Sequence, residues 1–183
     1  VPKPGSNLMR TVDIRLQEVV EEALERHVPG MTDETEGAAC VITDMTGGVL
    51  ACASYPSFDP ATYRKNYNDL AADPLKPMLN RALQGLYAPG STFKMAVAAG
   101  ALEEGAITRT EKIQDTGRYK HYDRIEDQPM CWIYRQYGGT HGSVNVSEAI
   151  RDSCNVFFYE TGLRLGISGI DQYAALFGLG EAT

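Results

Sequence analysis

A proline-glycine pair followed by a long apolar run constrains this chain more than any other stretch. Pro89 and Gly90 break the backbone, and residues 93–102 are then mostly apolar and compatible with a helix. A helix that is hydrophobic on all sides is buried in a core, and we expect this one to begin near Ser91. Lys94 lies on the same helical face as Ser91. The sequence therefore predicts that a lysine is carried into a core.

This serine and lysine suit nucleophilic chemistry. A buried amine loses the hydration of its charged form, so its pKa falls and Lys94 can act as a general base. Ser91 is then a candidate nucleophile, and the helix N-terminus offers backbone N–H groups to a developing negative charge. In the structural alternative, Ser91 only caps the helix and the Lys94 amine reaches to water.

Ser153, Cys154 and Asn155 form a second polar element, at the break between two predicted helices. A hydroxyl and a carboxamide two positions apart can both face a cleft. Ser153 would relay a proton there, and Asn155 would hold a peptide amide. The two elements occur together, and in this order, in the active-site serine penicillin-binding proteins.

On these motifs, the chain resembles the class B penicillin-binding proteins, most of all their elongation or sporulation type. Further matching segments are residues 10–13, 51–60, 80–82, 141–142 and 158–160. The resemblance implies an α/β (α+β) chain with part of the penicillin-binding protein/serine β-lactamase-like transpeptidase fold. We expect residues 1–56 to form a helix and a β-hairpin of the antiparallel sheet, and residues 57–183 to form a mainly helical lobe with the active-site serine.

The third motif of that family, Lys-Thr-Gly, occurs nowhere in the 183 residues. Its strand follows the Ser-x-Asn element in the resembled proteins, so we expect the chain to be a fragment whose remaining sheet strands are absent. The hairpin edge left exposed would favour self-association. The resemblance also implies a membrane anchor upstream of Val1 and a place on the extracytoplasmic side of the bacterial cell membrane.

The resemblance implies a D,D-transpeptidase that cross-links peptidoglycan stem peptides ending in D-Ala-D-Ala through a serine acyl-enzyme. The implied catalytic residues are Ser91, Lys94, Ser153 and Asn155, and no cofactor or metal ligand is assigned. β-Lactam antibiotics and a cell-wall glycosyltransferase are the implied partners of the intact protein. Because the Lys-Thr-Gly strand supplies one oxyanion donor, we expect the chain alone to be nearly inactive.

Two other functions stay open. A serine β-lactamase or β-lactam sensor domain also uses Ser-x-x-Lys. Hydrolysis by a β-lactamase needs a base that activates the deacylating water, and no glutamate-rich loop of the sequence is an evident candidate for it. A non-catalytic binding or scaffold module of the cell-wall synthesis machinery would leave the serine idle. The formal charge of −7 argues against nucleic acid as a partner.

Residues 115–142 are polar and hard to place, and they raise the question of a metal site. The candidate ligands are Asp115, His121, Asp123 and Cys131. Asp, His and Cys are zinc ligands, but this spacing matches no compact ligand motif, and polar loop residues explain the same composition. His141 is expected to be structural.

Trp132, with Tyr134 and Tyr137, is expected to pack the loop against the helical lobe or to line the cleft.

The first half of the chain contains clear local signals. Asp13 should cap a helix over residues 14–27. Residues 38–44 and 49–55 predict an antiparallel hairpin that is covered on both faces. Cys40 and Cys52 could meet across it, or the four cysteines could be free thiols.

Residues 56–77 are expected to be irregular, and Asn80 and Arg81 are expected to bond loop carbonyls. Further helices are predicted over residues 146–152, 154–165 and 170–177.

Overall fold

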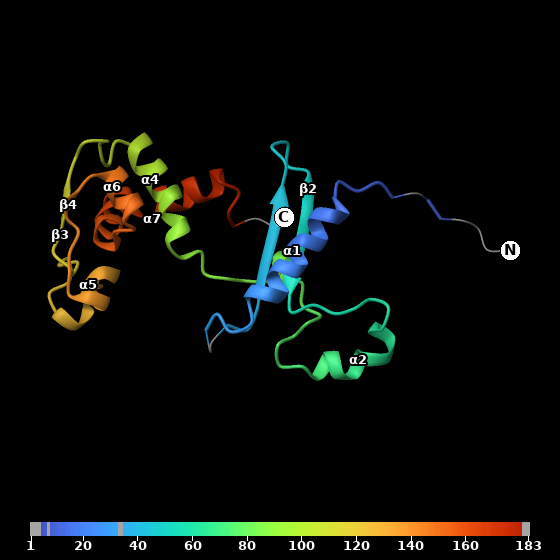
Figure 1. Cartoon of the computed structure of the whole chain (residues 1–183). Helices are drawn as coiled ribbons and strands as arrows, with labels where there is room; N and C mark the ends of the chain where they lie inside the picture. The colour runs from blue at the N-terminus through green and yellow to red at the C-terminus, as the bar shows by residue number, and fades with distance from the viewer. Residues whose placement is uncertain (1–4, 7, 33–34, 181–183) are drawn as a thin grey trace. The chain divides into compact units, whose positions relative to one another are not determined.

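The computed structural model describes residues 5–6, 8–32 and 35–180, and it combines helices with two small antiparallel sheets (Figure 1). The predicted mixed α/β class is therefore confirmed. The chain divides into two compact units, Val1–Tyr87 and Ala88–Thr183. In the described part, no helix combines the length and the apolar character that a bilayer crossing requires.

The first helix of the first unit has the predicted bounds. Its described elements are α1 (Ile14–His27), β1 (Ala38–Thr43), β2 (Val49–Tyr55), α2 (Tyr63–Ala72) and α3 (Arg81–Gln84). The carboxylate of Asp13 accepts hydrogen bonds from the backbone N–H groups of Arg15 (2.9 Å) and Leu16 (3.3 Å). These bonds satisfy two of the donors that a helix start leaves unpaired. The local cap therefore explains why the start of α1 could be predicted.

β1 and β2 form the predicted antiparallel hairpin, and α1 packs against one face of it. Ala51 and Ala53 of β2 form a small core with Val20 of α1. The prediction that both faces are covered is wrong, because β1 alternates between half-buried and exposed residues and Val41 is 48% exposed. A short apolar run cannot by itself distinguish a strand covered on both faces from one covered on a single face.

The hairpin also decides between the alternatives for its cysteines. Cys40 is paired with Ala53 and Cys52 with Val41, so the two cysteines are offset by one position. Neighbouring positions on a strand point to opposite faces of the sheet. The predicted cross-strand contact is therefore wrong, and all four cysteines are free thiols.

Helix α2 corrects the prediction that residues 56–77 are irregular. None of its residues is buried, so α2 lacks the apolar stripe by which a sequence usually reveals a helix. Its N-cap residue, Thr62, makes no side-chain capping bond. The sequence of α2 therefore contains neither an apolar stripe nor a capping side chain from which the helix could have been predicted.

Asn80 and Arg81 both have structural roles, but only Arg81 bonds loop carbonyls as predicted, because Asn80 accepts from a backbone N–H group instead. The Asn80 side chain accepts a hydrogen bond from the Leu83 N–H group (3.2 Å) and caps α3. Arg81 is only 7% exposed, and its guanidinium donates to the carbonyl groups of Leu75 (2.5 Å) and Lys76 (3.2 Å). These bonds satisfy a buried charge with backbone oxygens.

The second unit is mainly helical. Its described elements are the 3₁₀ turn η1 (Gly90–Phe93), α4 (Lys94–Glu103), β3 (Ile113–Asp115), the 3₁₀ turn η2 (Ile125–Asp127), α5 (Trp132–Tyr137), β4 (Gly142–Val144), α6 (Val146–Arg151) and α7 (Asn155–Leu176). α4 packs against α7, and both contribute to one core that includes Ala101 and Phe157. The predicted buried helix after Pro89 and Gly90 is thus confirmed.

Two elements of this unit differ from the predictions in their extent. α6 begins at the predicted residue, where Asn145 and Glu148 form a capping box. The two helices predicted over residues 154–165 and 170–177 are two parts of α7, separated by a kink at Gly166 with φ +73°. The second part begins directly after this glycine because only one residue leaves the helical conformation.

A short strand pair organises the segment that the sequence left unplaced. β3 and β4 are antiparallel, with Ile113 paired to Val144 and Asp115 paired to Gly142. This pairing places the end of β3 beside His141, which directly precedes β4. Residues far apart in the sequence are thereby brought together next to the junction of α6 and α7.

Candidate active site

Ser91 and Lys94 lie at the junction of η1 and α4. Gly90, which begins η1, has φ +56°, a backbone conformation that glycine adopts without the penalty of a Cβ atom. Ser91 follows it and is exposed, whereas Lys94 is the first residue of α4 and is half-buried. The predicted position of the serine at a helix start is confirmed, with one 3₁₀ turn preceding the α-helix.

Ser153 and Asn155 lie between α6 and α7. Ser153 occupies the short junction between the two helices, and Asn155 is the first residue of α7. All four residues singled out from the two sequence motifs are brought together within the second unit. They therefore share one local site, although about 60 positions separate the two motifs in the sequence.

The Lys94 amine is surrounded by oxygen acceptors of the second motif. Its Nζ atom donates to the carbonyl oxygen of Ser153 (2.9 Å), to the Ser153 hydroxyl (3.0 Å) and to the Asn155 side-chain oxygen (2.6 Å). An ammonium group has three N–H donors, and these three acceptors match that number. The predicted inward orientation of the lysine is therefore confirmed.

Ser153 connects the lysine to Ser91. The Ser153 hydroxyl donates a hydrogen bond of 2.9 Å to the Ser91 hydroxyl. Among the described residues, no hydrogen bond joins the Ser91 hydroxyl directly to the Lys94 amine. The Ser153 hydroxyl therefore bridges the two groups that the sequence predicted to exchange a proton directly.

The surroundings of Lys94 act on its charge in both directions. Burial is the largest influence and lowers the pKa of Lys94 from its ordinary value, against the opposing effect of the Cys131 and Cys154 thiols. The three oxygen acceptors and the Phe158 ring, 5.5 Å from the amine, favour the charged form. The amine can therefore lose its proton more easily than an exposed lysine, yet it is held in place when charged.

Most of the sequence, including all four residues singled out from the two motifs, matches a known domain family. A family model described as the penicillin-binding protein transpeptidase domain matches residues 37–183.

The chain belongs to the penicillin-binding protein transpeptidase family.

Relatives of this penicillin-binding protein support the predicted class B assignment, which is confirmed. The chain is 36% identical to the peptidoglycan D,D-transpeptidase MrdA of Escherichia coli over 188 residues, covering all of this chain and 28% of the relative. It is similar to the crystal structure of Pseudomonas aeruginosa PBP2 in complex with WCK 5153, with a TM-score of 0.81 and 35% identity, over 98% of this chain and 37% of that one.

A second similar structure is the penicillin G acyl-enzyme complex of penicillin-binding protein A from Mycobacterium tuberculosis. It has a TM-score of 0.73 and 28% identity, over 93% of this chain and 40% of that one. The chain thus spans between about a quarter and two fifths of the length of these proteins.

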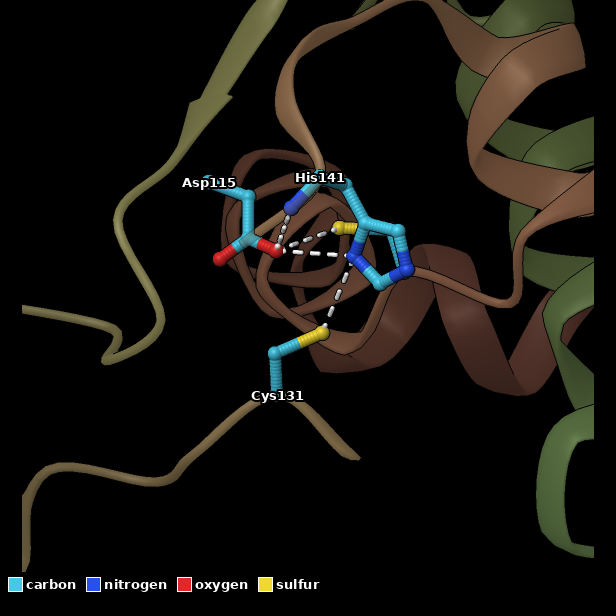
Figure 2. Close-up of side chains that lie close together, drawn as sticks. Asp115, Cys131 and His141 are labelled. Atoms are coloured by element: carbon cyan, nitrogen blue, oxygen red, sulfur yellow. Dashed lines mark hydrogen bonds and ion pairs between the residues drawn. The ribbon is translucent and has the colours of Figure 1, made fainter. Parts of the chain in front are cut away.

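A second cluster of side chains lies next to the Ser-x-Asn element. It consists of Asp115, Cys131, His141 and Cys154, whose potential metal-binding atoms all lie within 4.8 Å of one another. Figure 2 shows the carboxylate of Asp115, the imidazole of His141 and the thiol of Cys131 pointing toward a common centre. The cluster is almost fully buried.

The contacts within the cluster are short. The His141 Nδ1 atom lies 2.8 Å from Asp115 Oδ2 and 3.4 Å from Cys131 Sγ, and Cys154 Sγ lies 3.6 Å from Asp115 Oδ2. Ligands bound tetrahedrally to zinc lie about 3.3–3.8 Å from one another, for bonds of about 2.0–2.3 Å. One carboxylate, one imidazole and two thiols are also a donor set that suits zinc. The cluster would therefore fit a zinc ion after small side-chain shifts that lengthen the 2.8 Å separation and shorten the longer ones, which extend to at most 4.8 Å.

Ionisation within the cluster is set by burial and hydrogen bonding. Burial is the largest influence on Asp115 and opposes its ionisation, but N–H donors of His141 (3.1 Å) and Gly117 (2.7 Å) hold the pKa of Asp115 below its usual value. Burial raises the pKa of the Cys154 thiol to about 12. A bound divalent cation would reverse the effect on the thiol, because it stabilises the thiolate directly.

The sequence identified only half of this cluster. Asp115 and Cys131 were candidate ligands, but His121 and Asp123 are not part of the group; the His121 ring stacks on Tyr119 instead, with ring centres 5.8 Å apart. His141 and Cys154 take their places. No local spacing could have shown this, because the pairing of β3 with β4 brings Asp115 to His141.

The cluster is physically joined to the Ser-x-Asn element. Cys154 is itself the middle residue of that element, between Ser153 and Asn155. In addition, the Asn155 backbone N–H group donates to Cys131 Sγ (3.3 Å). Any ligand that fixes the two thiols would therefore fix the backbone that carries both polar side chains.

Proposed function

We propose that the intact protein is a serine D,D-transpeptidase, and that Ser91 forms the acyl-enzyme. The observation that carries this proposal is the continuous hydrogen-bonded path from Ser91 through Ser153 to Lys94. The penicillin G acyl-enzyme complex of the similar M. tuberculosis protein supports covalent chemistry in this family. The substrate would be a peptidoglycan stem peptide ending in D-Ala-D-Ala.

The reaction begins when Lys94 is uncharged, because its free lone pair can then accept from the Ser153 hydroxyl, which turns from Ser91 to the amine and in turn accepts from Ser91. Ser91 gives its proton to the Ser153 oxygen while Ser153 gives its own proton to the Lys94 amine, and the Ser91 oxygen attacks the penultimate D-alanine carbonyl. The Ser91 backbone N–H group, at the start of the helical segment, is one donor for the resulting oxyanion. The second donor would belong to the Lys-Thr-Gly strand of the intact protein.

Collapse of this intermediate breaks the peptide C–N bond. The proton returns from Lys94 through Ser153 to the leaving amine of the terminal D-alanine, and an ester to Ser91 remains. The amine of a neighbouring stem peptide then attacks the ester and loses a proton to the same path, which regenerates the Ser91 hydroxyl. Asn155 would hold an amide of the acyl donor, as its side-chain N–H₂ group can donate while its oxygen accepts from Lys94.

The place and the partners of the intact protein belong to the same proposal. The substrate implies a site of action on the extracytoplasmic side of the bacterial cell membrane, beside a cell-wall glycosyltransferase that makes the glycan strands. β-Lactams would acylate Ser91 because their strained amide imitates the D-Ala-D-Ala bond. The 183 residues contain no Lys-Thr-Gly motif to supply the second oxyanion donor, and alone they would acylate at least about 10²-fold more slowly than the intact protein.

Labelled penicillin and intact-mass measurement test this proposal. The intact protein should gain the mass of one penicillin, and Ser91→Ala should gain none. Rapid turnover of nitrocefin would favour a β-lactamase instead. If Ser91→Ala kept the full cellular role of the protein, a binding or scaffold function would replace the enzymatic one.

We further propose that Asp115, Cys131, His141 and Cys154 hold a zinc ion with a structural role. The complete set of four side-chain donors leaves no position for a substrate, which is typical of structural rather than catalytic zinc. The ion would tie α5, α7 and the β3–β4 pair together next to Ser153 and Asn155. No step of the acyl transfer passes through it.

A further inference from the structure

We infer that Trp132 is a positioning residue for the acyl-transfer site, acting on the backbone that carries Ser153. This inference rests on the proposed function. Its basis is a 3.0 Å hydrogen bond from the indole Nε1–H group of Trp132 to the carbonyl oxygen of Asp152. Asp152 is the C-cap residue of α6 and directly precedes Ser153, so the indole holds the peptide group that leads into the site.

Ser153 needs such support because its backbone is strained. Its φ angle is +52°, in the left-handed region that residues with a Cβ atom rarely adopt. Strained conformations of this kind persist only where the surrounding contacts fix them. Within the junction, the N–H groups of Ser153 and Cys154 donate to Ile150 (3.2 Å) and Ala149 (2.9 Å). Trp132 adds a contact from outside the junction.

The indole and the lysine hold Ser153 from two sides. Trp132 fixes the peptide group before Ser153, and the Lys94 amine binds the carbonyl group after it at 2.9 Å. Between these two points, the Ser153 hydroxyl reaches both Lys94 (3.0 Å) and Ser91 (2.9 Å). A rotation of the preceding peptide would turn Ser153 away from one of them and interrupt the proton path.

The indole is itself held in a defined orientation. Its ring meets Tyr137 edge-to-face, with ring centres 6.4 Å apart, and packs at a tilt against His141 at 5.8 Å. Because these two rings fix the plane of the indole, its N–H group points in one defined direction. Among the described residues, the other side chain that hydrogen-bonds Asp152 is that of Arg151, which pairs with the carboxylate rather than the carbonyl oxygen and is largely exposed. Arg151 therefore cannot replace Trp132.

The test compares Trp132→Phe, which keeps an aromatic ring but loses the donor, with Tyr137→Phe, which leaves the indole bond intact. Binding of a fluorescent penicillin to the intact protein and its acylation rate constant are measured separately by stopped flow. We expect Trp132→Phe to lower the acylation rate constant about five- to tenfold, the effect of one lost hydrogen bond, with the dissociation constant of the noncovalent complex unchanged. Tyr137→Phe should change neither.

Hydrogen exchange over residues 150–156 supplies a readout that does not depend on activity. Trp132→Phe should speed exchange at these amides and leave the rest of the second unit unchanged. Equal acylation rates with unchanged exchange would overturn the inference, and so would a general rise in exchange, which indicates packing alone. A wild-type protein that penicillin does not acylate would refute the proposed function, while the exchange comparison would still decide the role of Trp132.

Discussion

The Ser153 hydroxyl donates a 2.9 Å hydrogen bond to the Ser91 hydroxyl, and so joins the two halves of the candidate active site. The Lys94 amine lies on the far side of Ser153. A proton that leaves Ser91 therefore has a continuous path to the amine. The first prediction concerns the central member of this path.

Ser153→Ala should lower the rate of acylation by penicillin about 10²- to 10⁴-fold, the usual contribution of a positioned proton-transfer group. The rate constant is measured with the intact protein and a fluorescent penicillin. Ser143→Ala is the matched control, because Ser143 is an exposed serine on β4 and makes no hydrogen bond to the site residues within the described part of the chain. Wild-type acylation by Ser153→Ala would mean that Lys94 and Ser91 exchange the proton without Ser153.

The acylation rate should rise with pH and level off at an inflection below 10.5, the ordinary pKa of lysine. Burial is the largest cause of the lowered pKa of Lys94, and the uncharged amine is the proposed base. Lys94→Arg, which stays charged, should be inactive at every pH. An inflection at or above 10.5 in the wild-type protein would contradict the assignment of Lys94 as the base.

The same lowered pKa predicts the sign of an effect on stability. Between the folded and the unfolded pKa of Lys94, the unfolded chain binds more protons than the folded one. The contribution of Lys94 to the free energy of unfolding therefore increases as the pH rises through this window. Comparing the pH dependence of urea unfolding between the wild-type protein and Lys94→Met measures this contribution, and an opposite slope of the difference would refute it.

The cysteine cluster predicts zinc binding at one ion per chain. Protein purified with added zinc should retain about one equivalent after gel filtration, measured by mass spectrometry of the metal, and Cys131→Ala should lose it. Cys52→Ala is the control, because Cys52 is a half-buried free thiol on β2, outside the cluster. Retention of zinc by Cys131→Ala, or its absence from the wild-type protein, would show that the four groups form only a hydrogen-bonded network.

Arg81→Ala should destabilise the first unit by about 2–4 kcal/mol. The change removes a buried side chain together with the two hydrogen bonds that its guanidinium donates to the carbonyl groups of Leu75 and Lys76. Arg64→Ala is a matched control on α2, where the side chain is exposed, and should change the free energy of unfolding by less than about 0.5 kcal/mol. Equal unfolding midpoints in urea for the two variants would contradict this account.

The sequence revealed those parts of the protein that depend on nearby residues. The bounds of α1 follow from the Asp13 cap and the apolar spacing, and the position of Ser91 and Lys94 follows from the break at Pro89 and Gly90. Helix α2 could not be found in this way, because it buries none of its residues. The physical signal for that helix is absent from its own sequence.

The cluster around His141 escaped prediction for a different reason. Asp115 and His141 are 26 positions apart and meet through the register of β3 and β4. That register cannot be predicted from the spacing of the residues in the sequence. The role of Ser153 was likewise only partly predictable. Its type indicated a proton relay, but its place between Ser91 and Lys94 depends on the left-handed turn after α6.

The pairing of β3 with β4 determines where the sequence of this protein can change in length. It closes residues 116–141 into a loop whose two ends meet at Asp115 and His141 of the cluster, while every residue of the tip, 121–127, is exposed. Doubling the length of a flexible loop costs only about 0.6 kcal/mol in closure entropy. We therefore expect insertions at the tip to be tolerated, because they would add surface there without displacing Asp115 or His141.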